Sequence, residues 1–261
     1  MNEDKLIIAI AKDKLEKCQN NYMITNTVFL DMRQQTLCRN ILGNNMDCRG
    51  FFYGGYDEAE RQIALFLPEY IPAKSAEEVK NYFEENKDEN PLSLIRVTHS
   101  GYKELNHRDY LGSLIGLGIK RESIGDIIVY KGGADVIVLK ELTEFLLANY
   151  NQVGRTEVQP SNVNLSDIKI PEGHMEEKGD TVASLRLDNV ISSAFNLSRT
   201  AATTAIKSGI VFVNNMQIEK PDKTVSQGDK LVLRGKGKVI LKEIGGNTKK
   251  DRIYITLMLM K

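Results

Sequence analysis

The sequence predicts an α+β fold in three segments, and two observations carry this prediction. Helical and strand-like patterns alternate along the whole chain, which is typical of mixed folds. Charge is also unevenly spread: residues 178–261 hold 15 Lys or Arg and 7 Asp or Glu, a net charge of +8, against 20 and 28 in the rest, a net charge of −8. We therefore expect an N-terminal α+β subdomain at 1–75, a middle domain at 76–160, a linker at 161–180 and a C-terminal domain with a basic tail at 181–261.

The composition is that of an ordinary soluble protein, with 41% hydrophobic and 27% charged residues. Cys18, Cys38 and Cys48 are odd in number and form no C-x-x-C pair, which indicates free thiols of a reducing compartment. The sequence shows no cluster of ligand residues that would indicate a bound metal, and we expect no other cofactor. The N-terminus lacks the features of a signal peptide, and no apolar window is long enough for a membrane span. We expect a soluble, cytoplasmic protein with no membrane partner.

Periodic apolar positions predict two helices in the first segment, at 6–15 and 27–42. Two short apolar runs follow at 51–55 and 63–68, joined by a connection that contains glycine. Such runs predict paired strands. The first segment is therefore expected to hold N-terminal helices and a small hairpin.

The middle segment has a clear element order of strand, helix, strand, strand, helix, strand, predicted at 94–98, 108–117, 126–130, 134–138, 141–150 and 156–159. Lys131-Gly132-Gly133 joins the two central strands and indicates a hairpin. This order is the split βαβ arrangement of ferredoxin-like domains and RNA-recognition motifs (RRM). RNA-recognition motifs stack bases on aromatic residues of their central strands. Here only Tyr130 qualifies, so we favour a scaffold or protein-contact role over base stacking.

The segment from Ser161 to Lys178 is polar, contains proline and glycine, and has no period, which predicts the linker. Beyond it, Arg186-Leu187-Asp188 opens a short helix. Ser198 is a good N-cap for a second helix, and Gly209 suits the left-handed position after its end. Strands at 211–213, 217–219 and 230–234 are expected, with turns at Asn214-Asn215 and Gly228-Asp229.

This C-terminal pattern resembles the small RNA-binding module named after ribosomal protein S-four. The shared residues are Arg186 to Asp188, Ser198-Arg199, Gly209-x-Val211-x-Val213-Asn214 and Gly228-Asp229, in that order over about 60 residues. Many members have glycine where this chain has Asn215, and asparagine also tolerates the positive φ of a tight turn. The resemblance implies an αL-type S-four RNA-binding domain.

Arg199 and Lys207 lie eight positions apart, so both can project from one side of the second helix. Asp188 is placed either to cap the first helix or to pair with an arginine and orient it for a bidentate phosphate contact. The alternative is that Arg186 and Asp188 form a purely structural pair and that the lysines are solvated. The full set of candidate RNA-binding residues is Arg186, Leu187, Asp188, Ser198, Arg199, Thr200, Lys207, Asn214, Arg234, Lys236 and Lys238.

Nearly the whole chain resembles the YlmH family of bacterial RNA-binding proteins. The residues that carry this resemblance are Gly54-Gly55-Tyr56 with Ala59-Glu60-Arg61, Leu111-Gly112, Gly116-Leu117-Gly118-Ile119-x-Arg121-Glu122, Ile124-Gly125-Asp126-Ile127, Arg234-Gly235-Lys236-Gly237-Lys238 and Thr248-Lys249-Lys250. The resemblance implies binding to ribosomal RNA and the large ribosomal subunit, near peptidyl-tRNA, in rescue of stalled nascent chains. We also expect the protein to be a monomer.

The principal alternative is an RNA-modifying enzyme, because such modules are often fused to catalytic domains. Arg186-Leu187-Asp188 superficially matches the context of a pseudouridine synthase aspartate, but no large catalytic domain follows it. The glycines between Gly112 and Gly118 lie in a helical pattern, where we expect close packing rather than the cofactor loop of a methyltransferase. His99, His107 and Asp109 have no nucleophile partner by pattern. We therefore expect no catalytic residues. A third alternative is a protein-interaction factor whose basic tail is only an electrostatic tether.

Overall fold

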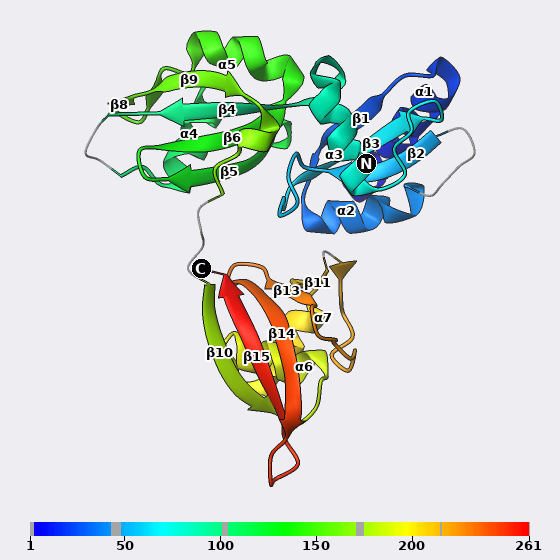
Figure 1. Cartoon of the computed structure of the whole chain (residues 1–261), viewed down its shortest axis with the longest axis vertical. Helices are drawn as coiled ribbons and strands as arrows, with labels where there is room; N and C mark the ends of the chain where they lie inside the picture. The colour runs from blue at the N-terminus through cyan, green and yellow to red at the C-terminus, as the bar shows by residue number, and fades with distance from the viewer. Residues whose placement is uncertain (1–2, 43–47, 101–103, 171–174, 215, 261) are drawn as a thin grey trace. The chain divides into compact units, whose positions relative to one another are not determined.

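The chain divides into two compact units, Met1–Pro171 and Glu172–Lys261. The computed structural model describes residues 3–42, 48–100, 104–170, 175–214 and 216–260 (Figure 1). The first two predicted segments lie together in the first unit. The expected α+β class is confirmed, with helices packed on sheets in both units.

The N-terminal part of the first unit is built on a three-stranded antiparallel sheet of order β1-β3-β2. Its elements are α1 (Glu3–Asn21), β1 (Thr25–Leu30), α2 (Met32–Cys38), the 3-10 turn η1 (Arg39–Ile41), β2 (Cys48–Tyr53) and β3 (Gln62–Pro68), followed by α3 (Ala76–Glu85) and η2 (Lys87–Glu89). The predicted pairing of the two apolar runs is confirmed as β2 with β3.

The helix predicted at 27–42 is wrong in its first part, because residues up to Leu30 form β1. Its β-branched and aromatic side chains, Thr27, Val28 and Phe29, favour an extended chain. The helix begins only after Asp31, whose carboxylate accepts the backbone N–H of Gln34 while the Gln34 side chain accepts that of Asp31. This reciprocal capping box fixes the start of α2.

The three-stranded sheet is covered on both faces. Helix α1 and the segment after β1 pack on one face around Leu30, Ala64 and Phe66, together with all three cysteines, which are buried free thiols. The other face packs against α3 and against one face of the middle sheet through a shared apolar cluster. The first two segments thus share a core, which explains why they form one compact unit.

The middle sheet is antiparallel with the strand order β5-β6-β4-β9, as expected for the split βαβ arrangement. Its elements are β4 (Leu92–Thr98), α4 (His107–Gly116), η3 (Arg121–Ser123), β5 (Ile124–Tyr130), β6 (Gly133–Leu139), η4 (Lys140–Leu142), α5 (Thr143–Asn149), the short pair β7 (Gln152–Val153) and β8 (Thr156–Glu157), β9 (Gln159–Val163) and η5 (Leu165–Asp167). Gly132 has a φ of 86° in the predicted β5–β6 hairpin. The last strand of the sheet is β9 rather than the predicted 156–159: Thr156 and Glu157 pair locally with β7, and Gln159 is the first residue of β9.

The second unit has a six-stranded sheet of order β10-β15-β14-β13-β11-β12 with two helices. Its elements are β10 (Met175–Val182), α6 (Leu187–Ala194), α7 (Arg199–Lys207), β11 (Val211–Val213), β12 (Met216–Gln217), β13 (Lys230–Leu233), β14 (Gly237–Asn247) and β15 (Ile253–Met260). Both helices contribute to one apolar core with the sheet, including Leu187, Val190, Ile206, Leu231 and Leu257.

Three local signals in this unit are confirmed, but the strand expected at 217–219 is β12 at Met216–Gln217. The Ser198 hydroxyl accepts the backbone N–H of Ala201, and Gly209 and Gly228 have φ values of 72° and 89°. Asn214, the first turn residue, has a φ of 51°, while Asn215 lies outside the described residues. The predicted linker is shorter than 161–180, because β9 extends to Val163 and β10 begins at Met175.

Among the described residues, none of the helices combines the length and the apolar character that crossing a bilayer requires.

Candidate nucleic-acid interface

The centre of the candidate site is a carboxylate held between two arginines. Asp188, in the first turn of α6, is only 3% exposed. Arg186 donates to both of its oxygens, from Nε to Oδ1 and from Nη2 to Oδ2, at 3.1 Å each. Arg199, at the start of α7, donates from Nε and Nη2 to Oδ2 at 3.3 Å. The sequence left capping and pairing open for Asp188, and the structure shows that it pairs with two arginines.

The two guanidinium groups remain accessible although Asp188 is not, since their side chains are 41% and 61% exposed. Burial disfavours the charged form of Asp188, but hydrogen bonds from Arg186 and Arg199 outweigh it, so the pKa of Asp188 lies below its usual value. The cluster therefore carries a fixed negative charge inside and two oriented positive charges outside. Each guanidinium keeps N–H groups for a second, external acceptor.

The start of α7 adds further anion-binding groups. Ser198, Arg199 and Thr200 are all exposed there. The first backbone N–H groups of a helix lack intrahelical acceptors and favour an anion. Lys207 is also exposed and lies about 12 Å from Arg199 along the axis of α7. The two residues differ by less than a quarter turn around this axis, so both project from the same side of the helix. Lys207 has no ion-pair partner among the described residues.

Two of the predicted contact residues have structural roles. Leu187 is fully buried in the core of the second unit, so it cannot contact RNA in this fold, and its inclusion was wrong. Asn214 is exposed, but its amide donates to Asp229 at 2.8 Å and accepts the backbone N–H of Lys230 at 2.9 Å. These bonds fix the turn between β11 and β12 against β13.

The remaining predicted cations surround the turn between β13 and β14. Arg234 and Lys236 are exposed and Lys238 is half-buried. The backbone N–H of Arg234 donates to Ile210, directly after α7, at 3.0 Å. This bond ties the β13–β14 turn to the end of α7, so these cations and Lys207 belong to the same end of the unit.

Tyr130, the candidate aromatic of the middle sheet for base stacking, is half-buried and contacts its neighbours. The Tyr130 hydroxyl donates to buried Asp135 at 2.9 Å, and Arg96 forms a bidentate pair with the same carboxylate at 2.8 and 2.9 Å. Lys169, beyond β9, donates its backbone N–H to Asp135, and its ammonium lies 4.8 Å from the centre of the Tyr130 ring. Burial opposes ionisation of Asp135, but these donors keep its pKa below the usual value.

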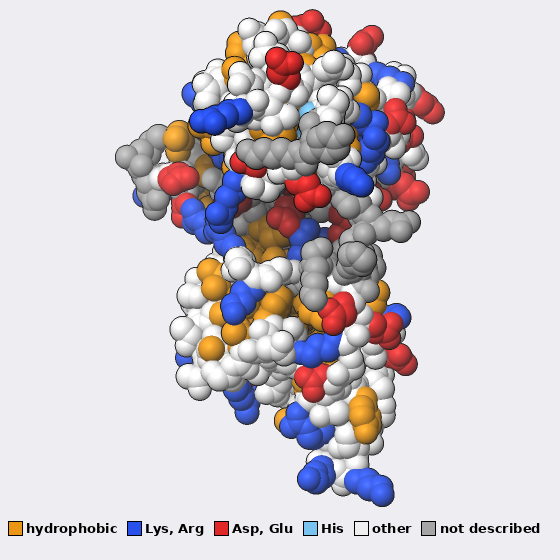
Figure 2. All heavy atoms as spheres, turned by 90° about the vertical axis from the view of Figure 1, so that its left-hand side faces the viewer, with side chains coloured by type: hydrophobic (Ala, Val, Ile, Leu, Met, Phe, Trp, Pro, Cys, Tyr) orange, Lys and Arg blue, Asp and Glu red, His pale blue; other side chains and the backbone are white. Residues whose placement is uncertain are grey.

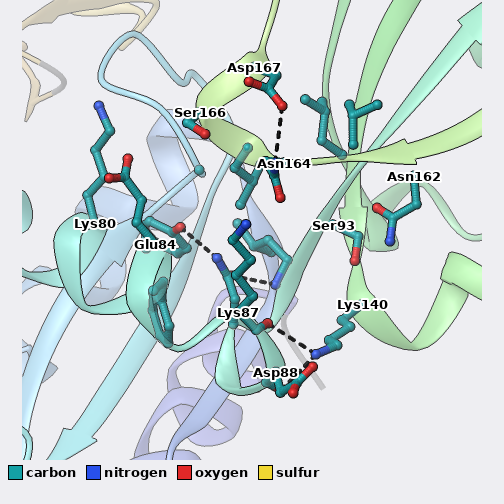
Figure 3. A pocket seen from close by; sticks show the side chains of 18 residues that line it. Lys80, Glu84, Lys87, Asp88, Ser93, Lys140, Asn162, Asn164, Ser166 and Asp167 are labelled. Atoms are coloured by element: carbon teal, nitrogen blue, oxygen red, sulfur yellow. Dashed lines mark hydrogen bonds between the residues drawn. The ribbon is translucent and has the colours of Figure 1, made fainter.

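The first unit contains a cleft of about 570 Å³ lined by charged and polar side chains (Figure 3). It lies between α3 and η2 on one side and β4 and β9 on the other, and Tyr53 lies in its lining. Three lysines and three acids line it, so its formal charge is balanced: Lys80, Lys87, Lys140, Glu84, Asp88 and Asp167. Lys140 donates to the carbonyls of Lys87 and Asp88. Burial raises the pKa of Tyr53 to about 12, so its hydroxyl stays protonated.

Of the residues considered for catalysis in the sequence, Asp109 has a local structural role, whereas Nδ1 of His99 is buried with no hydrogen-bond partner among the described residues. The Asp109 carboxylate accepts the backbone N–H of Asn106 and completes the capping box of α4. Burial lowers the pKa of His107, with a further contribution from Arg121. The prediction of close packing at Gly112 and Gly116 was wrong, because a Cβ added at either position would meet no atom within 4 Å. Gly118 instead has a φ of 84° just past the helix end.

Two family models, one relative and one solved structure match parts of this chain. The family model described as "Putative RNA-binding domain in YlmH" matches residues 76–167, and the S4 domain model matches residues 185–231. The chain is 36% identical over 239 residues to the "Ribosome-associated protein quality control protein P2" of Bacillus subtilis (strain 168), covering 91% of this chain and 88% of that protein. A solved structure, "Cell division protein ylmH from Streptococcus pneumoniae", aligns with 65% of this chain and 96% of its own at 17% identity and a TM-score of 0.49.

The fold of the second unit, its arginine cluster and the S4 match define an RNA-binding protein with a C-terminal S4 domain. The Bacillus subtilis relative, which is 36% identical over 91% of this chain, shows the family to which this RNA-binding protein belongs. The chain belongs to the YlmH family.

Proposed function

We propose that this protein is a non-enzymatic factor that binds ribosomal RNA on the large ribosomal subunit and acts in the rescue of stalled nascent chains. The observation that carries the proposal is the pair of exposed guanidinium groups held by buried Asp188 inside the S4 domain. The name of the Bacillus subtilis relative, a ribosome-associated protein quality control protein, supports the ribosomal context.

The arginine cluster suits a folded RNA better than a generic polyanion. Asp188 fixes the planes of both guanidiniums, so the positions of their remaining N–H groups are set before RNA arrives. A phosphate contacted by such a fixed fork is bound in a defined direction. Lys207 and Lys236 supply charge with less geometric restriction. The set therefore combines attraction to any RNA with a preference for a particular arrangement of phosphates.

Sedimentation of the full chain with ribosomes in cell lysate tests the anchoring. We compare wild type with Arg186→Ala/Arg199→Ala, and with Lys5→Ala/Lys12→Ala as a control that removes the same charge from exposed positions of α1. Wild type and the control should travel with the large subunit, and the arginine variant should stay at the top of the gradient. Wild type at the top, or both variants bound equally, would contradict the proposal.

The role in rescue needs a separate measurement. Purified large subunits carrying peptidyl-tRNA should bind the full chain more tightly than empty large subunits, because a factor for stalled chains must recognise the obstructed particle. Equal affinity for the two particles would remove the rescue role and leave general binding to the large subunit.

A further inference from the structure

The β14–β15 hairpin extends the second unit well beyond the residues that match the S4 domain, which end at 231. Leu241, Ile255 and Leu257 of this hairpin are in the core, whereas residues 245–247 are exposed. The pairing of the two strands is irregular between Leu241 and Glu243 and again between Ile244 and Asn247. Such bulges bend a hairpin and redirect its side chains. The far end of the hairpin is thus a projecting element (Figure 1).

The tip of the hairpin is held in one conformation by its own hydrogen bonds. The backbone N–H of Thr248 donates to the Arg252 carbonyl at 2.7 Å, and that of Asp251 donates to the Thr248 carbonyl at 2.9 Å. The Thr248 hydroxyl accepts the backbone N–H groups of Lys250 and Arg252. Asn247 donates to the Asp251 carboxylate at 2.9 Å. These bonds make the tip an ordered turn.

Lys249 and Lys250 occupy this turn, are exposed, and have no ion-pair partner among the described residues. With Arg252 they give the tip three positive charges against the single carboxylate of Asp251. Figure 2 shows Lys and Arg side chains at the lower end of the second unit, where Figure 1 places this turn. An ordered turn with excess positive charge is suited to phosphate contacts.

An aromatic platform lies beside these charges. Tyr254 is 53% exposed on β15. Arg252, just before β15, reaches the same face of the sheet, because it donates to the Thr181 hydroxyl and Thr181 is the register partner of Tyr254. Arg252 is held there by Thr181 of β10, to whose hydroxyl Nε donates at 3.0 Å and to whose carbonyl Nη2 also donates. Across the hairpin, Gly245 presents no side chain, and a Cβ there would lie 3.1 Å from the Tyr254 Cβ.

We infer that the β14–β15 hairpin is a second RNA contact, specific for an unpaired, single-stranded or looped segment. Tyr254 stacks on an exposed base, and Lys249, Lys250 and Arg252 bind the neighbouring phosphates. Stacking requires a base that is not already enclosed in a helix, so a duplex can use only the phosphate contacts. The combination of an exposed ring and an anchored arginine on one face favours this RNA over other polyanions.

One RNA can reach both contacts in the second unit. Val182 pairs with Ile253 at the base of the projecting tip. Only four positions separate Val182 from Arg186, so the chain keeps Arg186 within about 14 Å of the hairpin base. A structured RNA bound at the arginine cluster can therefore place an adjoining loop on Tyr254. This inference extends the RNA binding of the S4 domain and does not depend on the ribosome being the source of the RNA.

The test measures equilibrium binding of the full chain to two fluorescent RNAs, a stem with an eight-uridine loop and a blunt duplex of the same stem. Tyr254→Ala should weaken binding to the looped RNA by about tenfold and leave duplex binding unchanged. Tyr254→Phe keeps the ring and should bind both RNAs like wild type. Lys249→Ala/Lys250→Ala should lower the slope of log affinity against log salt by about 1.4 for the looped RNA.

Wild-type affinity of Tyr254→Ala for the looped RNA would overturn the inference, and so would an equal loss on both RNAs. An unchanged salt slope in the lysine variant would remove the phosphate contacts at the tip. Thermal melting of each variant checks that the exposed substitutions leave the fold intact. Both probes are free RNAs, so a failure of ribosome sedimentation does not affect this result.

Discussion

Replacing Asp188 with asparagine separates two explanations of RNA binding that otherwise predict the same behaviour. The substitution removes one negative charge from between Arg186 and Arg199 and nearly preserves the side-chain shape. If the second unit acts only as a cationic surface, the loss of a carboxylate strengthens RNA binding. If Asp188 positions the two guanidiniums, the same substitution weakens binding, because both side chains are then disordered before RNA binds. The two explanations therefore predict opposite signs.

The size of the effect follows from the two side chains that lose their fixed orientation. Ordering one long side chain on binding weakens affinity by roughly twofold to tenfold. Two arginines are involved, so we expect about a tenfold loss of affinity for a folded RNA. Arg186→Ala/Arg199→Ala should instead reduce the salt slope by about 1.4 to 1.8, since it removes two phosphate contacts, whereas Asp188→Asn keeps both charges and should leave the slope unchanged.

Fluorescence anisotropy with a labelled stem-loop RNA, at several salt concentrations, measures both quantities. In the Arg186→Ala/Arg199→Ala background, Asp188→Asn should have no further effect, because it acts only through the arginines. Tighter binding by the single variant Asp188→Asn would refute the positioning role. A further loss in the arginine-free background would show that Asp188 acts through the stability of the fold.

Three further predictions concern stability. Leu187→Ala should destabilise the second unit by about 2 to 5 kcal/mol, measured by urea unfolding, because Leu187 is fully buried in its core; a change below about 1 kcal/mol would contradict that packing. Folding lowers the pKa of Asp188 despite its burial, so the ionised carboxylate stabilises the folded state above the usual carboxyl pKa of about 4, and this stabilisation is lost as pH falls through the folded value. Asp188→Asn should therefore flatten the decline of the melting temperature in acid, and an unchanged decline would contradict this prediction. Gly112→Ala, inside α4 with open space around it, should stabilise the first unit by about 0.5 to 1 kcal/mol, whereas Gly133→Ala should destabilise it, since its Cβ would lie 2.3 Å from the Val97 carbonyl oxygen; thermal melts showing the reverse order would contradict the structure.

Residues that act locally were the ones the sequence predicted best. Ser198 caps α7 and Gly209 follows its end in the left-handed region, as expected, because a cap depends only on the few residues beside it. β1 was missed because its apolar and β-branched residues directly precede a genuine helix, and the two patterns merge into one helical period. The Asp31 N-cap was the signal that separates them.

The β14–β15 hairpin was missed because glycines and lysines interrupt its pattern. The alternation of Ile253, Ile255 and Leu257 with polar residues nevertheless indicates a strand with one buried face. The arginine cluster was only partly predictable. The spacing of Arg186 and Asp188 suggests a pair, but the contact with Arg199 requires α6 and α7 to pack together. Burial of Leu187 is likewise a result of that packing.

The central claim, that the second unit holds the RNA, is tested most directly by ultraviolet crosslinking of the full chain to purified large ribosomal subunits, with the crosslinked peptides mapped by mass spectrometry. We expect crosslinked peptides from residues 184–261, carrying nucleotides of large-subunit RNA, and their loss in Arg186→Ala/Arg199→Ala. Crosslinks confined to Met1–Pro171 would contradict the account and assign RNA binding to the first unit.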